Sequence, residues 1–131
     1  MDRLIDSSVL IQLERRAVGA DLIDALEERG GAISVVTASE LLHGVHRAGN
    51  DQRARRRSIV ERMLAIFDSV PIDLRVARVH SELWAELVSV GEKIDSHDLW
   101  LAATAVAHDF EILTLNTRDF ERVPGLKVAR F

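Results

Sequence analysis

Short apolar runs alternate along the chain with longer segments in which apolar residues recur at helical spacing. Apolar runs bounded by polar or turn residues predict buried strands. They are expected over Arg3–Ile5, Ala32–Val36, Val70–Ile72, Glu111–Leu115 and Lys127–Arg130. The third is expected at a sheet edge, because Pro71 cannot donate a hydrogen bond to a neighbouring strand. This alternation predicts an α/β fold with a mainly parallel central sheet flanked by helices.

The intervening segments show two kinds of helical pattern. Val76, Val79, Leu83 and Leu87 recur with the spacing of an amphipathic helix. The segment Asp98–His108 is apolar on almost every side, which predicts a helix buried in the middle of the molecule. The other helices are expected from Val9 to Leu13, over Asp21–Arg29, from Ala38 to about Gly49, and from about Asp51 to Asp68.

Four carboxylates lie just after predicted strands or at the start of the buried helix. Asp6 follows the first strand, Glu40 the second and Asp119 the fourth, whereas Asp98 opens the buried helix. Each also has a local explanation near a helix N-terminus, such as the capping box that Thr37 and Glu40 would form. The carboxyl ends of parallel strands share one edge of the sheet, where ligands bind. We therefore expect the four acids to converge there.

Convergence of carboxylates creates an electrostatic problem that a cation would solve. Carboxylates within about 4–6 Å of each other repel, so that one of them is driven to bind a proton. The chain has no cysteine, and no histidine pair has zinc spacing, so the available ligands are oxygens, which suit Mg²⁺ or Mn²⁺. Such an ion can position water and stabilise a phosphoryl transition state. The sequence thus predicts that Asp6 is a metal ligand at a strand terminus.

Composition and charge narrow the class of protein. A length of 131 residues fits one domain, expected over residues 1–131. The net charge of −4 argues against broad nucleic-acid affinity through phosphate neutralisation alone. The N-terminus shows no signal-peptide pattern and no apolar stretch reaches membrane-spanning length, so we expect a cytoplasmic protein that does not bind membranes.

Four motifs in order resemble the PIN-domain nucleases, and in particular the VapC-type toxins of bacterial toxin–antitoxin pairs. They are IDSSVLI, TASELLHGV, DLWLAA and LTLNTRDF, and the resemblance covers essentially the whole chain. It implies a PIN-like three-layer domain with Mg²⁺- or Mn²⁺-dependent endoribonuclease activity, which hydrolyses RNA phosphodiester bonds with a metal-activated water. It also implies a homodimer and inhibition by a cognate VapB-like antitoxin in a hetero-oligomer.

The resemblance also assigns roles to residues in the first three motifs. It implies that Asp6 and Asp98 are the main metal ligands. Glu40 would complete the site, directly or through water, and orient the attacking water. Ser7 or Ser8 would hold Asp6 or touch a phosphate.

The fourth acid of the family has two candidates. Many PIN domains have aspartate at the position of Asn116, whereas here the acid comes at Asp119. Asn116 could ligate through its carbonyl, or Asp119 could reach the site from the next turn. We favour Asp119 and a single bound metal.

The sequence also suggests two surfaces that could bind partners. The basic segment Arg53–Arg57 is either the solvated face of a helix or a guide for the RNA backbone. His97 could touch substrate, and the apolar residues near the first helices are expected to form a groove for an antitoxin helix: Val9, Leu10, Leu13 and Leu42.

A receiver-type phosphoacceptor domain also gathers acids at the edge of a parallel sheet. Lys93 and Lys127 are badly placed for that function, and Asp6 stands alone after its strand. A catalytically silent PIN module that only binds partners is a further alternative. The intact set of Asp6, Glu40 and Asp98 argues against it.

Overall fold

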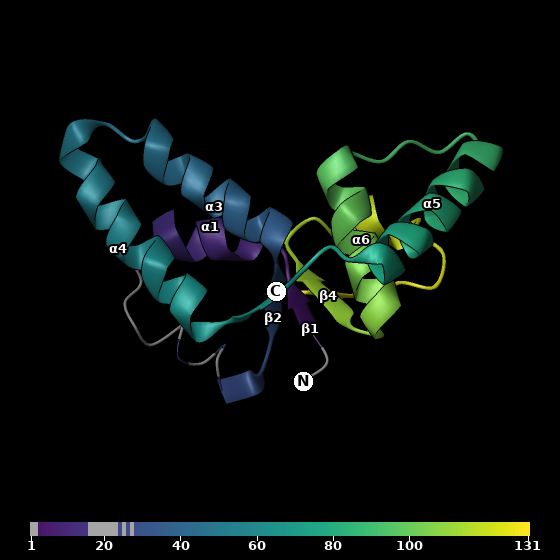
Figure 1. Cartoon of the computed structure of the whole chain (residues 1–131), viewed down its shortest axis with the longest axis horizontal. Coiled ribbons are helices and arrows are strands. Elements are labelled where there is room, and N and C mark those ends of the chain that lie inside the picture. Colours follow the sequence, from purple (N-terminus) through teal and green to yellow (C-terminus); the bar gives the residue numbers. More distant parts are fainter. Residues whose placement is uncertain (1–2, 16–23, 25, 27) are drawn as a thin grey trace.

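The structure, a computed structural model, describes residues 3–15, 24, 26 and 28–131. Within them, five parallel strands form one sheet in the order β3-β2-β1-β4-β5 (Figure 1). The strands are β1 (Arg3–Ile5), β2 (Ala32–Ser34), β3 (Asp68–Val70), β4 (Glu111–Thr114) and β5 (Lys127–Arg130). The expected α/β class with a parallel central sheet is confirmed. This order also differs from the 2-1-3-4-5 order of receiver domains, which excludes that alternative.

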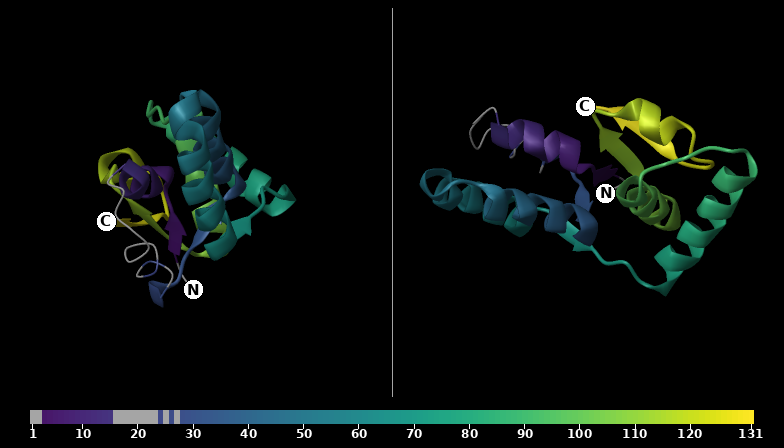
Figure 2. Two further views of the ribbon diagram at one scale, coloured as in Figure 1. Left: turned by 90° about the vertical axis from the view of Figure 1, so that its left-hand side faces the viewer. Right: turned by 90° about the horizontal axis from the view of Figure 1, so that it is seen from above.

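The helices form two groups, one on each face of the sheet. Figure 1 shows α1, α3 and α4 on one side of the strands and α5 and α6 on the other, and the view from above in Figure 2 separates the same groups. The helices are α1 (Ser7–Arg15), α3 (Val35–Arg47), α4 (Asn50–Ile66), α5 (Leu74–Ser89), α6 (Ser96–His108) and the short α7 (Thr117–Glu121). The three-layer arrangement is therefore present.

Consecutive strand residues enter two separate hydrophobic layers. On β1, Leu4 packs with α5 and α6, whereas Ile5 packs with α1, α3 and α4. On β4, Ile112 packs in the layer of α5 and α6, and Leu113 packs in the layer of α1, α3 and α4. Successive side chains on a strand point to opposite faces, so a strand covered on both sides is apolar throughout. This explains why the central strands were visible as mainly apolar runs, whereas the edge strands β3 and β5 are partly exposed and carry polar residues.

The second strand is shorter than the sequence predicted. It ends at Ser34 instead of Val36, because the Ser34 hydroxyl accepts a hydrogen bond from the Val36 backbone N–H (3.1 Å) and caps α3. The helix therefore begins at Val35. Thr37 lies fully buried inside it, and the predicted capping box of Thr37 and Glu40 is wrong. Glu40 lies in the second turn of α3 and does not take part in a helix cap.

One other strand boundary differs from the prediction, and one predicted helix is not tested. The edge strand is Asp68–Val70 instead of Val70–Ile72, although its edge position is as expected. The helix expected over Asp21–Arg29 lies largely outside the described residues. After this segment in the sequence, Gly30 has a φ of +80°, the left-handed conformation that glycine adopts readily.

In the part of the chain that the structure describes, no helix combines the length and apolarity needed to cross a membrane.

The short helix α7 is attached to the layer of α5 and α6 by one aromatic side chain. Phe120 is 1% exposed, whereas Phe131 at the C-terminus is 39% exposed. Phe120→Ala should lower the free energy of unfolding by about 3–5 kcal/mol, because it leaves a cavity in a packed layer. Phe131→Ala, the matched control, should lower it by only about 1 kcal/mol, because that ring is partly exposed. Urea unfolding followed by circular dichroism measures both values. Equal midpoints for the two variants would contradict the packing described here.

Candidate active site

Asp6 is a buried carboxylate at the carboxyl end of the central strand. Its backbone N–H donates to the Leu113 carbonyl (2.9 Å), which extends the β1–β4 ladder by one residue. Its Oδ2 accepts hydrogen bonds from the hydroxyls of Ser8 and Thr114, both at 2.8 Å. The residue is 4% exposed, and a buried carboxylate is costly unless such donors surround it. The hydroxyls therefore allow a negative charge to stay inside the molecule.

Thr114 is a site residue that the sequence interpretation missed. It ends β4, and the register that pairs Ile5 with Leu113 places Thr114 beside Asp6. Its hydroxyl also accepts a hydrogen bond from the Asn116 backbone N–H (2.9 Å). A parallel neighbour of β1 ending in a hydroxyl residue was the available signal, but using it required the strand order.

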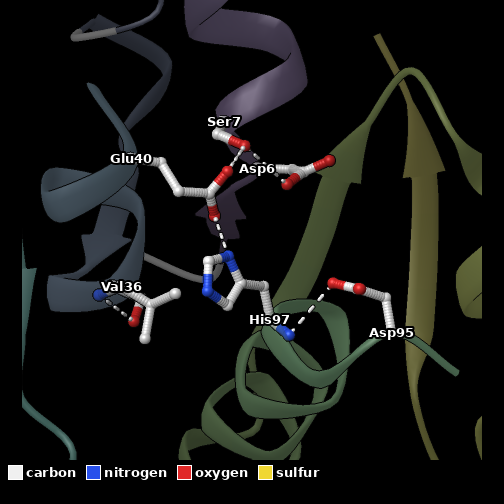
Figure 3. A network of polar contacts seen from close by, with 7 residues as sticks. Asp6, Ser7, Val36, Glu40, Asp95 and His97 are labelled. Atoms are coloured by element: carbon white, nitrogen blue, oxygen red, sulfur yellow. Dashed lines mark hydrogen bonds and ion pairs between the residues drawn. The ribbon is translucent and has the colours of Figure 1, made fainter. Parts of the chain in front are cut away.

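Glu40 is fixed from two directions, as Figure 3 shows. The Ser7 hydroxyl donates to Glu40 Oε2 (3.1 Å) and also lies 3.5 Å from Asp6 Oδ1. From the other side, His97 Nδ1 lies 3.3 Å from Glu40 Oε1. Ser7 belongs to α1 and His97 to α6, so Glu40 of α3 joins helices from the two faces of the sheet. His97 thus contacts an acid of the site.

The pKa of Asp98 reflects both its burial and the carboxylates near it. Its pKa is raised from 3.8 to about 6, first by burial and then by the carboxylates of Asp6, Asp95, Asp119 and Glu40. Two carboxylates influence each other in this way only when they lie near one another. The structure therefore brings the four predicted acids to one edge of the sheet, together with Asp95. Asp95 has its own local function, because its side chain accepts from the His97 N–H and caps α6.

Asn116 and Asp119 differ in how they face this cluster. Asn116 occupies the N-cap position of α7 without a side-chain capping bond. Asp119 contributes to the raised pKa of Asp98, but its Oδ1 also lies 3.6 Å from Arg122 Nη2. Its side chain is about half exposed, at 49%. The choice between the two as the fourth ligand stays a prediction.

The donor set fits a hard divalent cation in kind and in charge. Its members are carboxylates and hydroxyls, which are oxygen ligands of the type that Mg²⁺ and Mn²⁺ prefer, and the mutual repulsion at Asp98 is what such an ion would relieve. Across residues 3–15, 24, 26 and 28–131, however, no three Asp, Glu or His side chains already stand in a metal-holding arrangement. Glu40 is turned toward Ser7 and His97 instead.

The predicted apolar groove on the first helix is not present. Val9, Leu10 and Leu13 are at most 2% exposed and pack beneath α1 in the layer shared with α3 and α4. Their apolar spacing was correctly identified, but it marks the face of the helix that covers the sheet. A hydrophobic stripe of this kind does not distinguish a core face from a docking face. Leu42 of α3, the fourth residue of the expected groove, is partly buried against the same layer. The expectation that Val9, Leu10 and Leu13 bind an antitoxin helix is therefore wrong.

The chain is similar to known proteins over nearly its whole length. Residues 3–126 match the family model described as PIN domain. Ribonuclease VapC1 of Rickettsia felis is 34% identical, with 98% of this chain and 95% of that protein covered. Ribonuclease VapC4 of Mycobacterium tuberculosis is 36% identical, with 95% and 93% covered.

Two solved structures are similar in fold. The structure of VapBC2 from Rickettsia felis bound to a promoter DNA fragment covers 100% of this chain and 99% of its own, with a TM-score of 0.88 at 21% identity. VapBC-5 from Mycobacterium tuberculosis covers 100% and 98%, with a TM-score of 0.75 at 28% identity. The sequence and the fold thus point to the same group of proteins.

The raised pKa of Asp98 predicts a pH-dependent gain in stability when its charge is removed. Because the folded-state pKa of about 6 exceeds the ordinary value of 3.8, ionised Asp98 opposes folding, and stability is lost as the pH rises through about 6. With EDTA present, Asp98→Asn should raise the free energy of unfolding by about 1–3 kcal/mol at about pH 7.5. The gain should vanish near pH 4, where the wild-type carboxyl is protonated.

A matched control lies at the other end of the same helix. Asp109 follows α6 and forms an exposed pair with Lys127, with Oδ1 and Nζ 3.1 Å apart. Asp109→Asn should leave stability nearly unchanged at both pH values, since exposed ion pairs contribute little. Chemical denaturation at the two pH values measures all three proteins. A destabilised Asp98→Asn at pH 7.5 would show that the acids do not repel each other.

Proposed function

Because the chain belongs to the PIN-domain family and to its VapC-type members, we propose that it is a divalent-metal-dependent endoribonuclease that serves as the toxin of a type II toxin–antitoxin pair. The observation that carries this proposal is the convergence of carboxylates from distant segments: the Ser7 hydroxyl contacts both Asp6 and Glu40, and both acids act on the pKa of Asp98. Capping of individual helices does not require them to meet. A pocket that is negatively charged and lined by oxygen donors is suited to a metal-assisted attack on a phosphodiester.

In the proposed site, Asp6 and Asp98 hold Mg²⁺ or Mn²⁺, with Glu40 completing the site directly or through water. A bound cation of this kind would neutralise the pocket, lower the pKa of water and stabilise the negative charge of the phosphoryl transition state. Ser8 and Thr114 keep the carboxylate of Asp6 in place through their hydrogen bonds. We assign the fourth acidic position to Asp119 and a single metal to the site.

Glu40 has the geometry of a residue that orients water. Its two oxygens are held by Ser7 and His97, so the carboxylate is fixed before any substrate arrives. A fixed carboxylate beside a scissile phosphate can accept a hydrogen bond, and then a proton, from the attacking water. Ser7 and His97 are positioning residues in this scheme, because they act through Glu40.

The partner of the proposed toxin is a VapB-like antitoxin. The similar structures from Rickettsia felis and Mycobacterium tuberculosis are VapBC assemblies, in the second case described as a toxin–antitoxin system. By the same pattern, we assign to this chain a cognate antitoxin that blocks the acidic pocket, a homodimer as the toxin form, and the cytoplasm as the compartment in which it meets RNA.

Cleavage of RNA should require a divalent cation and the two proposed ligands. Purified free of antitoxin, the chain should cut total RNA with Mg²⁺ or Mn²⁺ and lose this activity in EDTA. Asp6→Asn and Asp98→Asn should each lower the rate by more than about 100-fold, because even outer-shell partners of a metal cost about 10–100-fold. Gel electrophoresis of the products measures the rates.

The control for this experiment is again Asp109→Asn, which makes the same chemical change outside the pocket and should keep full activity. Cleavage that continues undiminished in EDTA would end the proposal. Cleavage that survives Asp6→Asn while the metal requirement remains would move the metal to other residues.

The fourth acidic position is separated by two alanine variants. Asp119→Ala should reduce cleavage more strongly than Asn116→Ala, because Asp119 is one of the charges that act on Asp98. We expect a loss of about 10-fold or more for Asp119→Ala and a rise in the Mg²⁺ concentration needed for half-maximal rate. Loss of activity with Asn116→Ala alone would assign the position to Asn116.

A further inference from the structure

A cavity of about 440 Å³ opens beside the acidic cluster, among α1, α3 and α4. It shares two residues with the proposed active site, since Glu40 and His97 form part of its wall. The rest of the lining includes Glu14, Arg15, His43, Gly44, Arg47 and Arg56. A ligand that occupies this cavity is therefore in contact with the place where catalysis is proposed.

The lining is basic although the chain as a whole is acidic. Three arginines reach the cavity, Arg15 from α1, Arg47 from α3 and Arg56 from α4, while the formal net charge of the protein is −4. Outside the acidic cluster, the opposing charge in the lining is Glu14, whose Oε1 lies 3.4 Å from Arg56 Nε. With Glu40 counted as well, the lining carries three arginines against two glutamates, which leaves one positive charge in excess, and Arg15 and Arg47 lie outside the Arg56–Glu14 pair. Arginines grouped in this way match the charge and geometry of phosphate groups.

Gly44 leaves one wall of the cavity without a side chain. It lies inside α3, where glycine is less favourable than alanine. A Cβ placed on Gly44 would meet no atom within 4 Å, other than those of the glycine's own helix and neighbours. The packing of the fold therefore does not require a glycine here. Its effect is to keep the helix backbone accessible from the cavity.

We propose that this cavity, the phosphate groove, binds the sugar–phosphate backbone of the RNA immediately beside the bond that is cut. In this proposal, Arg15 and Arg47 contact the phosphates of the RNA. Arg56 is held in place by Glu14 and by its hydrogen bond to the Gly44 carbonyl (3.4 Å). The missing side chain at Gly44 leaves room for the RNA backbone. The inference rests on the proposed ribonuclease function and extends it from the scissile phosphate to its neighbours. The basic segment Arg53–Arg57 enters the substrate path through Arg56, whereas Arg57 pairs with Glu61 on its own helix at 4.0 Å.

The groove is tested by filling it and by removing one of its charges. Binding of a fluorescein-labelled single-stranded oligouridine is measured by fluorescence anisotropy in EDTA, so that no cleavage is needed for the result. Gly44→Gln should raise the Kd about 10-fold or more, and Gly44→Ala, which adds one methyl group, should raise it less. Arg47→Ala should raise the Kd about 5-fold and make the slope of log K against log salt shallower by about 0.7–1.

The matched control is Arg57→Ala, which removes an arginine from α4 outside the lining and should leave the Kd within about 2-fold. Thermal unfolding should show Gly44→Gln to be folded, since glutamine is the better helix former. In cleavage assays with Mg²⁺, Gly44→Gln and Arg47→Ala should raise KM with little change in kcat, as expected when only ground-state binding is removed.

The possible results separate the groove from the proposed function. Cleavage by the wild type together with unchanged Kd values for both variants would overturn the groove while leaving the ribonuclease in place. If Gly44→Gln and Arg47→Ala bind RNA like the wild type but bind the antitoxin encoded beside this gene more weakly, the cavity belongs to the antitoxin and the proposal is overturned. Absence of metal-dependent cleavage by the wild type would overturn the proposed function itself.

Discussion

The arrangement of the site depends on a buried negative charge at the end of the central strand. Asp6 is tolerated there because Ser8 and Thr114 donate hydrogen bonds to it, and because β1 and β4 are in a register that places Thr114 beside it. The other acids are then added to a pocket that already carries a charge. The pKa of Asp98 is raised first by its burial and then by these neighbouring carboxylates. Removing charge should therefore make the protein more stable, whereas the proposed activity requires that charge.

Two electrostatic environments lie side by side at this edge of the sheet. The acidic cluster is suited to a cation, and the phosphate groove next to it is suited to an anion. Glu40 and His97 belong to both. Under the proposed function, a polyanionic substrate is attracted by the arginines while its reacting phosphate is brought to carboxylates that would otherwise repel it. This resolves the apparent conflict between an acidic protein and a nucleic-acid substrate.

Much of this arrangement could be predicted from the sequence because its physical causes are local. The central strand segments were visible because both faces of the sheet are covered. The edge position of the third strand was predicted correctly, but Pro71, from which it was argued, lies just after β3 and outside the ladder. The α/β class and the membership of the PIN-domain family are confirmed. The roles of Asp6, Glu40, Asp98 and Asp119 stay predictions.

The features that were missed depend on contacts between distant segments. Placing Thr114 in the site required the strand register. Recognising that Val9, Leu10 and Leu13 are buried required knowing which face of α1 meets the sheet. The boundary at Ser34 was missed because two residues of high strand propensity, Val35 and Val36, were recruited into a helix by one hydroxyl cap.

The contact between Glu40 Oε1 and His97 Nδ1 joins helices that belong to different hydrophobic layers. Leu41 of α3 packs on one face of the sheet, and Leu101 of α6 packs on the other. The distance between Glu40 on α3 and the proposed ligand Asp98 on α6 therefore depends on how both layers pack against the sheet. A substitution deep in either layer, far from any substrate, shifts one half of the site against the other. We therefore expect paired substitutions, one in each layer, to compensate for each other, and we expect interior positions to tune the site as well as surface positions do.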